Sequence, residues 1–238
     1  MSGGEHFSKQ YDQELEAMRS RVLQMGGIVE AQIKSALDAF ENADPTLADS
    51  VIQADRRVNQ LEIDLDRLVN HVIARRQPTA VDLRMIMGVA KTITDLERIG
   101  DEATKIARAA KWIREKNTAA RVNRIPDIRA SGDIAHAMLR RSLDAFARLD
   151  AQEAATIIRD DAGVDERFRA ILRQLVTFMM EDPRSISASI DTVWVAKAIE
   201  RIGDHAKNIA EHVIFIAHGA DVKHMSPEDV ARAVEQAS

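Results

Sequence analysis

Two pairs of carboxylates are the residues in this sequence best placed to do chemistry. Glu97 and Asp101 form one pair, and Glu200 and Asp204 form the other. Residues four apart on an α-helix lie one turn apart on the same face, so each pair would present two carboxylates to one side. Eight of the eleven residues that begin at Glu97 recur in register in the eleven that begin at Glu200. The acidic pair therefore belongs to an internal duplication.

A second polar pair with the same spacing precedes each of these. Asp55 and Asn59 lie upstream of the first pair, and Asp161 and Asp165 lie upstream of the second. Helical bundles build carboxylate metal sites from acids that project inward from facing helices. Oxygen ligands suit hard cations, and iron also accepts them. We therefore predict divalent or trivalent metal ions on these oxygens, with iron, manganese, magnesium and zinc as candidates.

The two halves differ one turn farther along. The second half has Asn208 and Glu211 there, which are possible oxygen ligands, whereas the first half has Lys105 and Arg108. Because cations at these positions would repel a metal ion, we expect the second half to bind metal better, with Asn208 as a fifth ligand.

Two other interpretations of the acids compete with a regulatory metal site. One is an ordinary solvated helix face, on which Arg98 and Glu102 would form an (i, i+4) ion pair. The other is a metal store or a di-metal carboxylate enzyme. Di-iron bundles need Glu-x-x-His, and none of the seven histidines has a glutamate three residues before it. Without a nucleophile or phosphate-loop motif either, we expect no enzyme and no catalytic residues.

The elements that would position these acids are long helices. Apolar residues recur at spacings of three and four, and Pro45, Pro78, Pro183 and Pro227 indicate helix starts. Helices are predicted over 6–42, 46–76, 79–116, 128–149, 152–181 and 184–218, with a short one after Pro227. The fold expected is all-α: two tandem pseudosymmetric three-helix bundles of long antiparallel helices, 6–116 and 128–218, with a linker at 117–127 and a tail at 219–238.

Glycines interrupt the two predicted acidic helices at equivalent places. Gly100 and Gly203 each follow the Glu-Arg-Ile triplet, where a glycine costs a helix roughly 1 kcal/mol relative to alanine. Their presence in both copies indicates that something approaches the backbone closely at that turn, either a neighbouring helix or a bound ion.

Composition narrows the class of protein. The 238 residues are 45% hydrophobic and 30% charged, which is typical of a globular chain. The absence of cysteine excludes disulfides and thiolate metal sites. A net charge of −5 argues against nucleic-acid binding. No apolar run is long enough to span a bilayer and no signal peptide is evident, so we expect a cytoplasmic protein that could associate peripherally with a membrane.

The acidic motifs resemble those of a known family. Residues 96–103 and 199–206, together with Gln77-Pro78 and residues 219–224, closely resemble the paired signatures of the PhoU family over about residues 10–226. The resemblance implies a cytosolic, homodimeric negative regulator of the phosphate-starvation response. Its implied partners are the ATPase subunit of the phosphate ABC transporter and a phosphate sensor histidine kinase. It also implies metal clusters on Glu/Asp-x-x-x-Asp pairs, although Lys105 stands where the family commonly has Asn.

Overall fold

The computed structural model describes residues 3–115 and 126–237, and within these ranges it is helical with no strand. The all-α fold predicted from the sequence is thus confirmed. The helices are α1 (Gly3–Asn42), α2 (Pro45–Arg76), α3 (Ala80–Glu115), α5 (Pro126–Arg148), α6 (Ala151–Glu181), α7 (Ile186–His218) and α8 (Pro227–Ala237), with a 3₁₀ turn at Pro183–Ser185 before α7. Most of the expected linker lies outside the described residues.

Local chemistry explains the start of α2 but not that of α3. Pro45 is the first residue of α2, and Asp44 caps that helix by accepting hydrogen bonds from the backbone N–H groups of Thr46 and Leu47 at 2.9 and 3.1 Å. Pro78 does not open a helix as expected. It stands in the connection between α2 and α3, directly after Gln77, which ends α2 in the left-handed conformation at φ 48°.

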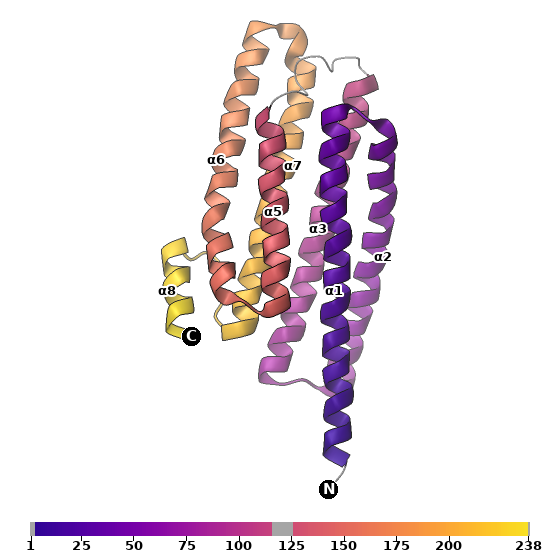
Figure 1. The fold of residues 1–238 in the computed structure, drawn as a ribbon, viewed down its shortest axis with the longest axis vertical. Coiled ribbons are helices and arrows are strands. Elements are labelled where there is room, and N and C mark those ends of the chain that lie inside the picture. The colour runs from indigo at the N-terminus through magenta and orange to yellow at the C-terminus, as the bar shows by residue number, and fades with distance from the viewer. Residues whose placement is uncertain (1–2, 116–125, 238) are drawn as a thin grey trace.

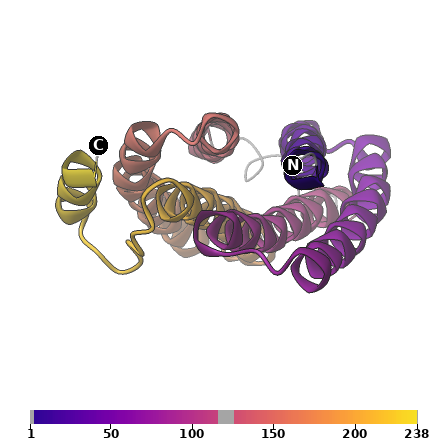
Figure 2. The ribbon, with the colours of Figure 1, turned by 90° about the horizontal axis from the view of Figure 1, so that it is seen from below.

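The six long helices form two groups of three that lie side by side (Figures 1 and 2). Helices α1, α2 and α3 contact one another, as do α5, α6 and α7; we call these groups the first and the second repeat. The repeats meet where α3 packs on α7 and α1 on α5, and α8 packs on α6 at the outer edge. Seen from below, α3 and α7 lie together in the middle of one curved layer that also contains α2 and α6 (Figure 2).

A reciprocal contact shows that the two repeats are related by a local two-fold axis. The α1–α5 contact places Gly26 against Leu143 and Gly132 against Leu37, and each residue of the first pair has its counterpart 106 positions away in the other. A Cβ added at Gly26 would lie 2.6 Å from Leu143 Cδ1, and one added at Gly132 would lie 2.5 Å from Leu37 Cδ2. Each leucine therefore fits into a space that only glycine leaves open.

Apolar side chains from all seven helices form one continuous core. Its largest fully buried members include Phe40 and Phe146, which are also counterparts 106 positions apart. Among the described helices, none is both long enough and apolar enough to cross a bilayer. The core positions α2 against α3 and α6 against α7, and these two contacts carry the predicted acids.

Candidate functional site

The first repeat gathers carboxylates from α2 and α3, as the spacing predicted. Burial, followed by the nearby charge of Asp101, raises the pKa of Asp55. Burial raises the pKa of Glu97 as well, with further contributions from Asp101, Glu62 and Asp55. These mutual effects require the four carboxylates to lie close together. We call Asp55, Glu62, Glu97 and Asp101 the first acidic cluster. Sequence reasoning missed Glu62, although it lies two turns after Asp55 on the same face of α2.

Several buried oxygen atoms beside this cluster make no well-aligned hydrogen bond. They are Gln32 Oε1, Asp55 Oδ1, Asn59 Oδ1 and Thr104 Oγ1. Gln32 and Thr104 nevertheless lie close enough to Asp55 to lower the pKa of its carboxyl group. Gly100 explains how two of them fit, because a Cβ there would lie 3.3 Å from both Asp55 Oδ1 and Gln32 Oε1. Unpaired buried oxygens cost free energy unless a proton or a cation satisfies them. The glycine of the first acidic helix therefore accommodates side-chain oxygens from two neighbouring helices.

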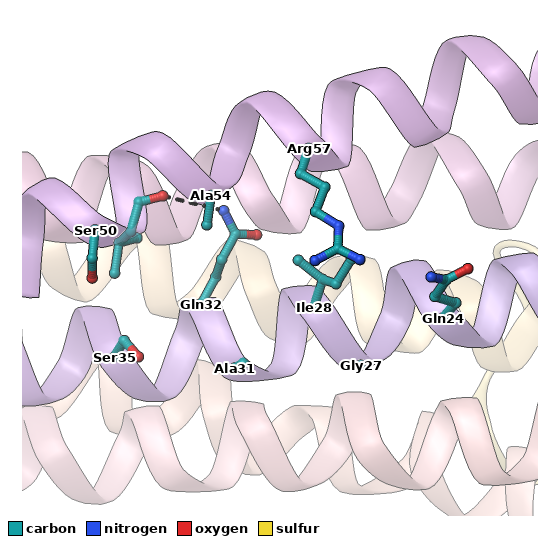
Figure 3. Close-up of a pocket in the computed structure, with 10 residues that line it drawn as sticks. Gln24, Gly27, Ile28, Ala31, Gln32, Ser35, Ser50, Ala54 and Arg57 are labelled. Atoms are coloured by element: carbon teal, nitrogen blue, oxygen red, sulfur yellow. Dashed lines mark hydrogen bonds between the residues drawn. The ribbon is translucent and has the colours of Figure 1, made fainter.

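Gln32 also lines an open cleft of about 370 Å³ between α1 and α2 (Figure 3). Its amide nitrogen donates to the carbonyl oxygen of Val51 at 3.4 Å, which holds the side chain across the gap. Small residues on both helices, including Gly27, Ala31 and Ala54, leave this cleft open. Gln32 thus lies between this cleft and the first acidic cluster.

The same position in the second repeat is closed by ion pairs. Arg141, the counterpart of Ser35, binds Glu153 at 2.6 Å and Asp160 at 2.7 Å. Because Asp160 is itself the counterpart of Ala54, the second repeat fills with charge the gap that the first leaves open.

The second repeat gathers its own four carboxylates from α6 and α7. The pKa of Asp204 is raised to about 6 by burial and then by the charges of Glu200, Asp161 and Asp165. We call Asp161, Asp165, Glu200 and Asp204 the second acidic cluster. The four acids predicted as ligands in this repeat therefore lie close enough to influence one another's protonation. Gly203 differs from Gly100, since a Cβ there would meet the apolar Val164 Cγ1 at 3.2 Å.

Lysines neutralise part of the second acidic cluster. Lys207 donates to Asp161 Oδ2 at 2.9 Å, and Lys197 donates to Glu200 Oε1 at 2.7 Å. Asp161 is only 6% exposed, so its pair with Lys207 is shielded from solvent. Neither lysine was among the residues expected beside these acids, where Asn208 and Glu211 were expected instead.

The cations of the first repeat contact other acids than those expected. Lys105 was expected to repel metal there, but it donates to Glu102 at 2.8 Å, on the side of α3 that faces the second repeat. Arg98 was expected to pair with Glu102 and instead lies 3.5 Å from Glu97 and 3.8 Å from Asp101. Arg98 therefore acts on this cluster and lowers the pKa of Glu97, and the charge of Arg108 lowers the pKa of Asp55.

Asn208, the expected fifth ligand, belongs to a polar network between the repeats. Its amide donates to Asp95 Oδ1 at 3.1 Å, and His205 and His212 bond the same carboxylate at 2.8 and 2.9 Å. Burial alone would raise the pKa of Asp95, but these hydrogen bonds lower it to about 2. The three α7 residues share one face through spacings of three and four, which is the sequence signal for this network.

The residues present fit a cation, although the acids alone do not form a ready-made metal site. Within the described residues, no three acidic or imidazole groups converge as metal ligands. The first acidic cluster nevertheless lies beside the buried oxygens of Gln32, Asn59 and Thr104. Both clusters raise the pKa of their own carboxylates, and a divalent ion would remove that repulsion. Metal binding at these residues stays a prediction that the donor chemistry supports.

Comparison with known proteins accounts for both repeats. The model of the PhoU domain matches residues 22–110 and again residues 128–213, one match in each repeat. The chain is 45% identical over 230 residues to the phosphate-specific transport system accessory protein PhoU homolog of Pseudomonas putida, covering 97% of this chain and 89% of that protein. It is 42% identical to the PhoU of Escherichia coli strain K12, covering 94% and 92%.

Solved structures agree with the sequence comparison. The crystal structure of PhoU from Pseudomonas aeruginosa matches with a TM-score of 0.85 and 44% identity, over 88% of this chain and 100% of that one. That of the phosphate transport system regulatory protein PhoU from Streptococcus pneumoniae matches with a TM-score of 0.81 and 26% identity, over 90% and 99%. The chain, with its two repeats of the same acidic helix pair, belongs to the PhoU family.

Proposed function

We propose that this protein is a non-catalytic accessory regulator of a phosphate-specific transport system. The observation that supports this most strongly is the match to proteins of that name over nearly the whole length of both chains. A regulator that acts through contacts needs long exposed helix faces rather than a catalytic pocket, and the helical layer of Figure 2 provides such faces.

In this proposal the protein represses the phosphate-starvation response while phosphate is plentiful. It would do so by contacting the ATPase subunit of the phosphate transporter and a sensor histidine kinase at the cytoplasmic side of the membrane. A homodimer is proposed as the working form. Each of these partners is an inference from the family.

The two acidic clusters are proposed as the metal-binding elements of this regulator. Asp55, Asn59, Glu97 and Asp101 would hold metal in the first repeat, and the second acidic cluster would do so in the second. A bound divalent ion would supply positive charge that offsets the repulsion among the carboxylates. Ligand binding to the folded state alone raises its stability, so metal would stiffen the pairing of α2 with α3 and of α6 with α7.

Deletion of the gene tests the regulatory role. Expression of phosphate-starvation genes in phosphate-rich medium should rise in the deletion strain and return to the basal level when the gene is restored. Unchanged expression in the deletion strain would contradict the proposal. Redox turnover of added iron with oxygen by the purified protein would favour a metal store or di-metal enzyme instead.

A further inference from the structure

A groove follows the contact between α3 and α7, and none of the acids of the two clusters lines it. Two adjoining pockets of about 350 and 330 Å³ form it, and they share Lys105, Ala109 and Trp194 as lining residues. Trp112 and Arg201 line opposite ends. One wall comes from the first repeat and the other from the second, so the groove exists only because the repeats are packed together.

Both tryptophans of the protein line this groove. Trp112 on α3 and Trp194 on α7 have 59% and 67% of their surface exposed, and the sequence contains no other tryptophan. Large exposed aromatic side chains are uncommon on a monomer surface and are enriched where a partner binds. Two of them on facing walls of one groove are the strongest binding feature outside the acidic clusters.

The local two-fold axis provides an internal comparison. The counterparts of Trp112 and Trp194, 103 positions away, are Phe215 and Lys91 at the opposite end of the α3–α7 contact. There the Lys91 Nζ lies 5.2 Å from the centroid of the Phe215 ring and covers it. One end of the contact thus carries a cation over an aromatic ring, whereas both indoles at the other end keep more than half of their surface exposed.

An internal carboxylate completes the covered end. Asp95 lies there, bound by His205, Asn208 and His212. Its counterpart in the groove is Ala198, which lines one of the two pockets, and the counterpart of Asn208 is Lys105. The groove therefore has a cation in place of an amide and a methyl group in place of the buried acid.

The charge of the groove is opposite to that of the whole protein. Its lining includes the cations Lys105, Arg108, Lys197 and Arg201, against the carboxylates of Glu102 and Asp191. Lys197 also binds Glu200 of the second acidic cluster, so one positive charge remains in excess. The complete chain carries a net charge of −5. A local excess of positive charge on an acidic protein attracts an acidic partner and sets its orientation.

We propose that this groove binds a segment of a partner protein in which an acidic residue lies beside a bulky apolar one. The apolar side chain would lie between the two indoles. The carboxylate would occupy the space beside Ala198, near Lys105 and Arg201, as Asp95 does at the covered end. The proposal rests on the proposed function only in that the protein acts through protein contacts.

Intrinsic fluorescence tests this directly, because the only two tryptophans lie in the groove. The full-length protein is titrated with a panel of capped twelve-residue peptides rich in Glu and Asp, each with one central Leu or Phe. A blue shift or quenching that saturates below about 1 mM is expected for the acidic apolar peptides. Peptides in which the apolar residue is Ser, or in which Lys replaces each acid, should bind at least about tenfold more weakly.

Substitutions test whether the fluorescence change comes from peptide bound in the groove. Trp194→Ala leaves Trp112 as the reporter, Trp112→Ala leaves Trp194, and each should weaken binding by about tenfold or more. Lys105→Glu should also weaken it, whereas Lys34→Glu, at an exposed position of α1, is the matched control and should not. Circular dichroism of each variant establishes that it is folded.

The proposal is wrong if no acidic apolar peptide binds below about 1 mM, or if Lys34→Glu weakens binding as much as Lys105→Glu. It is also wrong if a twelve-nucleotide single-stranded DNA binds more tightly than every peptide. These outcomes are independent of gene expression in the deletion strain, so they leave the proposed regulatory role standing.

Discussion

The two acidic clusters descend from the same repeated sequence, yet they compensate their charge in different ways. In the second cluster Lys207 and Lys197 bind Asp161 and Glu200 directly. In the first cluster no lysine does so among the described residues; Arg98 lies 3.5 Å from Glu97 and 3.8 Å from Asp101, and Gln32 and Thr104 lower the pKa of Asp55. The comparison teaches that an identical acidic motif fixes where carboxylates lie but leaves open what neutralises them. It also changes the expected order of metal affinity, which sequence spacing had placed in favour of the second repeat.

Removing the acids of a cluster should give the largest effect, a loss of metal uptake. We expect Glu97→Ala with Asp101→Ala to lower metal uptake at limiting metal by about tenfold, because it removes ligands of the cluster that has no internal lysine. Glu200→Ala with Asp204→Ala should lower it less. Metal per chain, measured by mass spectrometry after equilibration at fixed metal concentrations, provides the readout. If both double variants keep the metal content of the wild type, the acids form only a solvated helix face.

Removing the lysine that neutralises Asp161 should reverse part of the difference in metal uptake between the two clusters. Lys207→Met removes the cation from Asp161, so we expect the second cluster to bind metal about fivefold more tightly, which corresponds to an ion-pair contribution of about 1 kcal/mol. Isothermal titration with the chosen metal measures this in the Glu97→Ala, Asp101→Ala background. Lys105→Met is the matched control and should change nothing, since Lys105 binds Glu102. Equal responses to the two lysine variants would refute the comparison.

The pH dependence of stability should identify Asp204 in the metal-free protein. Its folded pKa of about 6 lies above the ordinary 3.8, so the folded state holds the proton more tightly than the unfolded state does. Stability from this group is therefore present below pH 3.8 and is lost as pH rises to about 6. Asp204→Asn should flatten that part of the curve and raise Tm by a few degrees at pH 7. Thermal melts in chelator from pH 4 to 7 measure it, and parallel curves for the two proteins would contradict the assignment.

Replacing Gly203 or Gly100 with alanine should give the smallest effect, a change in the free energy of unfolding of about 1 kcal/mol or less. Gly203→Ala forces a methyl group against the buried Val164 and should cost about 1 kcal/mol despite the gain in helix propensity. Gly100→Ala meets the more adjustable ends of Asp55 and Gln32, so propensity should offset the contact and leave stability within about 0.5 kcal/mol of the wild type. Urea denaturation of both variants distinguishes these outcomes. A larger loss for Gly100→Ala would show that the oxygen pair beside it is rigid.

The sequence predicted the all-α fold and which carboxylates lie near one another in each repeat, while their role as metal ligands stays a prediction. The helices and the grouping of the acids could be predicted because proline, the three-and-four spacing and the repeat each act within one helix or between adjacent ones. Periodicity shows which residues share a face, and that sufficed to bring Asp55 near Asp101 and Asp161 near Asp204. Glu62 followed the same rule and was overlooked.

The rest depends on contacts between helices that no single spacing contains. Gln32 reaches the first cluster from α1, and Asp95 meets His205 and His212 only because α3 and α7 pack antiparallel. The directions of Lys105 and Lys207 likewise depend on which neighbouring acid each side chain reaches. Tertiary packing determines these contacts, so chain position alone did not show that Lys105 binds Glu102.

The reciprocal fit of Leu37 on Gly132 and of Leu143 on Gly26 has the form of an isologous interface, in which the same surface patch serves both partners. In an isologous dimer, one substitution would change two contacts at once. Because both partners here lie on one chain, each contact can change separately, and the two sides are free to specialise. The two ends of the α3–α7 contact differ in this way: one end buries the carboxylate of Asp95, and the other keeps two exposed indoles.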